Sequence, residues 1–222
     1  MRVPLVPVRP VRTPRKTKGM RLPRWTAAAL VLVATVAQLL LATFARDLPQ
    51  FAGKAFGARL VSYPVLMLLV PLLWRVRHRR GDRAPRPVPR PVPWAGFTLV
   101  MLPFLVDVSG NTLNLYDTVV WWDDALHFLN WCLLTLGLGL VLDVAAVRPR
   151  WARAVAVVGG GALLALLWEV GEWWTFIRHG TEIATAYEDT LGDMALGTTG
   201  SAVALVLLVL RAGRGRPVRA RP

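Results

Sequence analysis

The chain has 222 residues, of which 55% are hydrophobic, and a formal net charge of +14 at pH 7. Soluble domains contain roughly 45–50% apolar residues. Here the excess falls into long apolar runs, whose lengths approach the about 20 residues that a helix needs to cross a bilayer. This pattern excludes an ordinary soluble enzyme. The Lys and Arg residues lie between and outside these runs, and no element that reads nucleic acid accompanies them, so we predict no nucleic-acid partner.

The pattern of apolar runs predicts an all-α integral membrane protein, in which six transmembrane helices form one bundle over residues 25–210. The segments at either end, 1–24 and 211–222, are basic and rich in Pro or Gly, and we predict that they are disordered tails. The first apolar run is longer than the about 7–15 residues of a signal-peptide core, so we interpret it as an uncleaved span. In chain order, the predicted spans are about 25–45, 59–74, 94–108, 123–143, 153–177 and 189–210.

The basic residues are distributed unequally between the two sides of these spans. Residues 1–24 contain eight Lys and Arg, the second-to-third loop seven, the fourth-to-fifth loop three and the final tail five. The other side contains only four, which are Arg46, Lys54, Arg59 and Arg178. This bias predicts a multi-pass protein of a bacterial plasma membrane with both termini in the cytoplasm. The basic cytoplasmic segments would then contact anionic lipid headgroups.

Titratable residues gather at the opposite, outer end of three predicted spans. They are Asp123, Asp124 and His127 in the fourth span, Glu169 and Glu172 in the fifth, and Asp189 and Asp193 at the sixth. The three aspartates that begin helices can cap free N–H groups and suit the helix dipole. That explanation does not cover the other four, since an ionisable group inside a span costs about 2.5–3.5 kcal/mol or more when central. We therefore expect them to face one another or a wet cavity.

The spacing of these residues allows each helix to present a pair of them on one face. The pairs Asp123/His127 and Asp189/Asp193 are four residues apart, and Glu169/Glu172 are three apart. Carboxylates with an imidazole are a ligand set for Mg²⁺, Mn²⁺ or Zn²⁺. A neutral hydrogen-bonded network and a proton relay are equally compatible with the pattern. No spacing matches a specific zinc motif such as H-E-x-x-H, and the single Cys132 lies in an apolar run, where it reads as a packing residue.

Three motifs in successive spans resemble those of the YjdF-like family of bacterial inner-membrane proteins. They are Asp123-xxx-His127-Phe128, Glu169-xx-Glu172-Trp173 and Asp189-Thr190-xx-Asp193-Met194, and the resemblance covers roughly residues 94–205. Asn130 and Trp131 follow the histidine where the family would have a Gln-Gly-like pair. A looser likeness is to VanZ-like envelope proteins. These likenesses imply a helical membrane fold and a site at the motifs, and neither implies an established reaction.

Three functions are compatible with this pattern. The first is a cation-dependent envelope enzyme that acts on a lipid-linked or phosphorylated substrate at the outer bilayer face. The second is a small transporter or ligand-binding membrane protein, and the third is a structural polar network that joins three helices. The outer side shows no cluster of Arg or Lys to hold a phosphate, which counts against the first. The chain shows no inverted repeat, which counts against the second.

Overall fold

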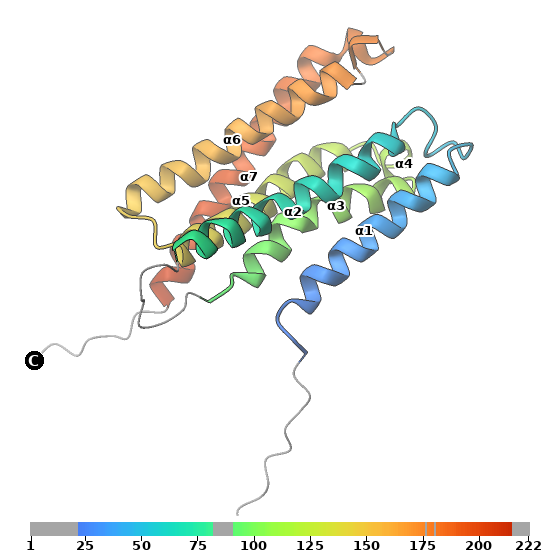
Figure 1. The fold of residues 1–222 in the computed structure, drawn as a ribbon. Coiled ribbons are helices and arrows are strands. Elements are labelled where there is room, and N and C mark those ends of the chain that lie inside the picture. The colour runs from blue at the N-terminus through green and yellow to red at the C-terminus, as the bar shows by residue number, and fades with distance from the viewer. Residues whose placement is uncertain (1–21, 82–90, 176, 180, 215–222) are drawn as a thin grey trace, which may run out of the picture.

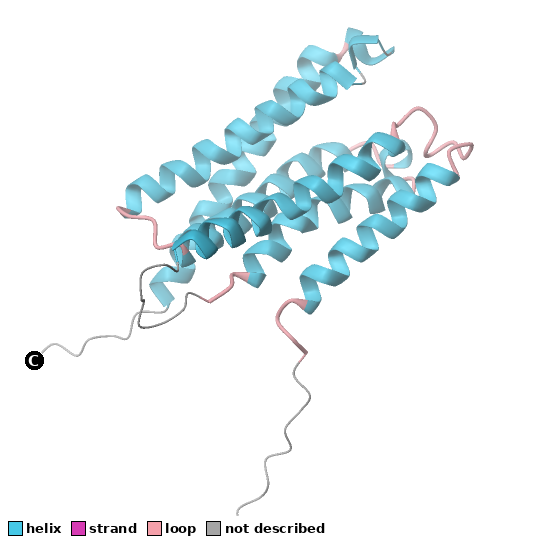
Figure 2. Ribbon diagram, in the orientation of Figure 1, coloured by secondary structure: helices cyan, strands magenta, loops and turns pink. Residues whose placement is uncertain are grey.

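A computed structural model describes residues 22–81, 91–175, 177–179 and 181–214. In these residues the regular structure is entirely helical, without a strand (Figure 2). The elements are α1 (Thr26–Phe44), α2 (Phe56–Gly81), α3 (Trp94–Thr112), α4 (Leu115–Thr118), α5 (Trp122–Val144), α6 (Arg150–Thr175), the 3₁₀ turns η1 (Ile177–His179) and η2 (Thr181–Ala184), and α7 (Ala186–Arg214). Six of these helices are long and apolar enough to cross a membrane, which confirms the predicted helical membrane bundle. Most of the two predicted tails, residues 1–21 and 215–222, lies outside the described residues.

Several helices continue past the ends of the apolar runs. Helix α3 ends at Thr112 rather than near residue 108, and the side chains of Asn111 and Thr112 donate to carbonyls one turn earlier. Helix α2 continues to Gly81 through a basic segment, since charged residues end an apolar run without breaking helical hydrogen bonds. Helix α6 ends at Thr175, two residues before the predicted limit of 177. Its Thr175 hydroxyl donates to the Gly171 carbonyl.

Helix α5 occupies the centre of the bundle. It packs against α3 and α7 and also contacts α6, while α1 and α2 pack on the far side of α3. Figure 1 shows the resulting order, with α6 and α7 along one edge and α1 to α3 along the other. Glycines permit the close approaches: a Cβ on Gly137 of α5 would lie 2.8 Å from the carbonyl oxygen of Gly96 in α3, and one on Gly200 of α7 would collide with the Phe128 carbonyl. Close backbone contact at small residues is characteristic of helix packing in lipid.

The outer faces of the helices carry large apolar side chains. Val33 of α1, Val61 of α2 and Leu167 of α6 are 65%, 68% and 55% exposed. Surfaces of this kind are compatible with a bilayer and not with water. Inside the bundle, Leu39, Met67 and Val108 are fully buried and join α1, α2 and α3 into an apolar core.

The polar residues of interest lie near one end of the bundle. The α1–α2 connection, α4 and the 3₁₀ turns gather there, whereas α1 begins and α7 ends at the opposite end (Figure 1). The first and last described residues are therefore on the same side of the bundle. This arrangement places the beginning of α5, the end of α6 and the beginning of α7 beside one another.

Candidate functional site

A pocket of about 390 Å³ opens among α2, α3, α5, α6 and α7 near the end that carries α4. Part of its wall is aromatic or aliphatic, including Phe104, Leu126 and Trp168. The rest is polar and rich in charge. The charged groups are the carboxylates of Asp107, Asp117, Asp123, Glu172, Asp189 and Asp193 and the basic groups of Lys54 and Arg59, with His127 beside them. Carboxylates thus outnumber basic groups in the lining.

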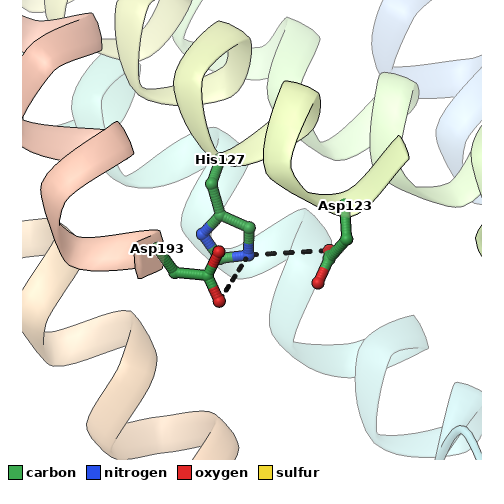
Figure 3. Close-up of side chains that lie close together, drawn as sticks. All are labelled: Asp123, His127 and Asp193. Carbon is green, nitrogen blue, oxygen red and sulfur yellow. Dashed lines mark ion pairs between the residues drawn. The ribbon is translucent and has the colours of Figure 1, made fainter. Parts of the chain in front are cut away.

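His127 stands at the centre of the acidic side of this pocket. It lies in the second turn of α5 and is only 8% exposed. Its Nε2 atom is 3.6 Å from Asp123 Oδ1 and 3.7 Å from Asp193 Oδ2. Figure 3 shows the two carboxylates pointing toward the imidazole from different helices. These distances exceed the 2.7–3.2 Å of a hydrogen bond. Two carboxylates from different helices therefore face one imidazole nitrogen without bonding to it.

The second ring nitrogen of His127, Nδ1, lies beside α6. His127 Nδ1 is 3.5 Å from Oε1 of Glu169, a side chain that is 2% exposed. Both atoms are buried without a hydrogen-bond partner in the described part of the chain. Glu172, one turn later and half-buried, completes a group in which His127, Glu169 and Glu172 offer ligand atoms within 4.8 Å of one another. Asp123, His127 and Asp193 form a second group by the same measure.

The structure brings five of the seven predicted residues into direct proximity and separates the other two. Asp189 lies at the edge of the pocket, where it is exposed, one turn before Asp193. Asp124 is also exposed and does not line the pocket. Asp124 lies three residues before His127, near enough to interact with it electrostatically, but from outside the pocket. Asp124 therefore fits the helix-start role that its sequence position also allows.

A second polar cluster, centred on Asp107 of α3, was not predicted as part of the site. Its Oδ2 atom accepts hydrogen bonds from the Tyr63 hydroxyl at 2.6 Å and from Arg59 Nη1 at 3.2 Å. Its Oδ1 atom accepts one from the Tyr116 hydroxyl at 2.7 Å. Burial raises the pKa of Tyr116, and the neighbouring carboxylate of Asp107 raises it further. Asp107 thus accepts hydrogen bonds on both oxygens, from α2 at Oδ2 and from the α4 segment at Oδ1.

We expected no cluster of Arg or Lys near the acidic residues, and the structure places two separate basic residues in this pocket. Lys54, from the α1–α2 connection, and Arg59, from the first turn of α2, both line it. Lys54 Nζ lies 2.9 and 3.0 Å from the two oxygens of Asp117. In the sequence these basic residues are isolated, and no local signal indicated that they line one pocket with the carboxylates of α5 to α7. Asp107 did give a signal, as a charged residue within an apolar run, but its partners could not be read from that signal.

Fold and pocket together define a multi-pass helical membrane protein with a charged pocket at one end of the bundle. Residues 23–214 match the model of a family described as predicted membrane protein, DUF2238, and the chain belongs to this family. No curated protein and no solved structure matches it. The family match agrees with the YjdF-like resemblance of the three motifs and extends it over the first two spans. The likeness to VanZ-like proteins has no support in these comparisons.

Proposed function

We propose that this membrane protein binds a divalent cation through His127 and the carboxylates of α5, α6 and α7. Nε2 of His127 with Asp123 and Asp193 would supply the principal ligands. Two ligand atoms that are each about 2.1 Å from a tetrahedral ion lie about 3.4 Å apart. The separations of 3.6 and 3.7 Å are close to that value. A mixed imidazole and carboxylate set suits Zn²⁺ or Mn²⁺ better than Mg²⁺.

The observation that carries this proposal is the contrast between two carboxylate clusters in one pocket. Asp107 has three hydrogen-bond donors, so its role as a structural link needs no ligand. Glu169 and His127 are more deeply buried, yet Glu169 Oε1 and His127 Nδ1 have no hydrogen-bond partner in the described residues. Leaving such groups unsatisfied costs about 1–3 kcal/mol each, and more when they are charged. A purely structural network would be expected to resemble the cluster at Asp107.

In this arrangement Glu169 is a positioning residue rather than a ligand of the principal site. A metal-bound histidine usually donates its second ring N–H to a carboxylate, which selects the tautomer and holds the ring. Glu169 is placed to accept from Nδ1 of His127, at 3.5 Å before any cation tightens the cluster. A bound cation would also reduce the repulsion among Asp123, Asp193 and Glu172, which meet around one imidazole. The function supported best is therefore the binding of a divalent cation at this cluster.

The test uses protein purified in a neutral detergent and stripped with a chelator. Titration with Zn²⁺ or Mn²⁺, followed by calorimetry, should show saturable binding. Asp193→Asn and His127→Gln should each weaken it by about 100-fold or more, because they remove ligands from the principal site. Asp124→Asn is the matched control, since it removes a carboxylate from the first turn of α5 that does not line the pocket. Absence of saturable binding, or equal loss in Asp124→Asn and Asp193→Asn, would refute the cation site.

We further propose that the pocket faces the outside of a bacterial plasma membrane, with both termini in the cytoplasm. Support comes from the bias of Lys and Arg toward the opposite end of the bundle. The basic segments at that end would then contact anionic headgroups of the inner leaflet. After replacement of Cys132, a cysteine introduced at position 80 should resist a membrane-impermeant thiol reagent in intact cells. Modification of that cysteine would reverse the proposed orientation.

A further inference from the structure

Two basic residues, Lys54 and Arg59, line the pocket and are not part of the proposed cation site. We infer that the ligand of this pocket carries a phosphate group, held between the cation at His127 and the side chains of Lys54 and Arg59. This inference rests on the proposed cation site. It specifies the class of ligand that the cation would recruit.

The positions of the charges favour such a bridge. Arg59 and Lys54 enter the pocket from the α2 side, whereas His127 and Asp193 enter from α5 and α7. Glu172 lies close enough to interact electrostatically with both Arg59 and Asp123, so the basic and acidic sides adjoin. A phosphate offers several oxygens at once and can bind a metal ion through one and basic donors through others. A second metal ion in the pocket would not bind to Lys54 and Arg59, because all three are positively charged.

The hydrogen bonds of the two basic residues hold them in place. Asp117 fixes the ammonium of Lys54 at 2.9 Å, and Asp107 fixes the guanidinium of Arg59 at 3.2 Å. Side chains that are already ordered lose less conformational entropy when a ligand binds. The same two carboxylates balance their charge, however, so the pocket remains negative without the cation. Phosphate binding should consequently require the cation.

The size and the wall of the pocket indicate that it has room for a ligand beside the metal ion. Its volume of about 390 Å³ lies within the roughly 300–1,000 Å³ of small-molecule pockets. Phe104, Leu126 and Trp168 provide an apolar wall beside the charged groups. The rings of Tyr63 in α2 and Trp168 in α6 are 6.4 Å apart and both line the pocket. The phosphate can thus belong to a lipid headgroup or be free in solution, and the same donors would bind either.

Titration of three ligands into the full-length protein in a maltoside detergent distinguishes a lipid headgroup from free phosphate. The ligands are inorganic phosphate, dihexanoyl phosphatidic acid, and dihexanoylglycerol as the analogue without phosphate. With Zn²⁺ present, at least one phosphate ligand should bind, and chelation should abolish that binding. Binding of phosphatidic acid alone identifies a lipid headgroup, and equal binding of inorganic phosphate identifies the free anion. Equal binding of phosphatidic acid and dihexanoylglycerol would overturn the inference.

Variants of the basic residues complete the test. Lys54→Ala and Arg59→Gln should each weaken phosphate binding at least about tenfold, the effect of losing one hydrogen bond to a charged group. Arg46→Ala, which removes an exposed basic residue outside the pocket, should leave it unchanged. Retained Zn²⁺ binding shows that each variant is folded. If Zn²⁺ binds and no phosphate ligand does, or if Lys54→Ala and Arg46→Ala behave alike, the inference is wrong while the cation site stands. If Zn²⁺ itself does not bind, the proposed function is wrong.

Discussion

Asp107→Ala should lower the free energy of unfolding by about 3–5 kcal/mol, the cost of removing one partner from a buried ion pair. The substitution leaves the guanidinium of Arg59 without the carboxylate that lies 3.2 Å away. It also removes the acceptor for the hydroxyls of Tyr63 and Tyr116, at 2.6 and 2.7 Å. Because these residues come from α2 and α4, the loss should loosen both elements from α3. Unfolding in mixed micelles of detergent and dodecyl sulfate measures the change.

Asp117→Ala provides the control for that experiment. Asp117 pairs with Lys54 at 2.9 Å, but its side chain is 43% exposed. A pair of this exposure contributes about 0–1 kcal/mol, because water screens the charges. We therefore expect a clear difference between the two aspartates, although each pairs with a basic residue of the same pocket. Equal destabilisation would show that Asp107 is not the link between α2, α3 and α4.

Glu169→Gln should change stability in opposite directions according to whether a cation is present. Without a cation, the variant should be at least as stable as the wild type, since one fewer carboxylate crowds His127 and Asp193. With Zn²⁺ at about 100 times its dissociation constant, the wild type should gain about 2.7 kcal/mol. Loss of the positioning carboxylate weakens metal affinity about 10- to 100-fold. The variant should then gain only about 0.4–1.4 kcal/mol, so that it loses half or more of the stabilisation.

Melting curves of both proteins, with chelator and with Zn²⁺, distinguish this result from a structural network. In such a network, glutamine at position 169 would leave a buried donor unpaired and lower stability by about 1–3 kcal/mol. Zn²⁺ would then shift neither curve. That combination would disprove the cation site and favour the structural role. Glu172→Gln, on the same face one turn later, tests whether the second carboxylate of α6 acts in the same way.

The helical membrane fold and most of the acidic cluster could be predicted from the sequence alone. Apolar runs of near-bilayer length specify helices whatever their packing partners, because backbone groups in lipid must bond within the helix. The spacings of Asp123 to His127 and of Glu169 to Glu172 are local properties of a helix, so each pair could be assigned to one face in advance. The cost of burying such groups then predicted that the helices present them to one another. The proximity of His127 to Glu169 and Asp193 agrees with that reasoning.

Which charged residues share the pocket could not be predicted from the sequence, because it depends on how the helices pack. Arg59 and Asp107 are 48 residues apart, and Tyr63 and Asp107 are 44 apart, so no local spacing connects them. Their contact depends on the rotation of α2 against α3, which is set by the packing of side chains along both helices. The rotation of α5 likewise brings Asp123 and His127 into the pocket lining and leaves Asp124 exposed outside it. Helical periodicity specifies which residues share a face, whereas the neighbours of that face are specified by contacts between helices that are distant in the chain.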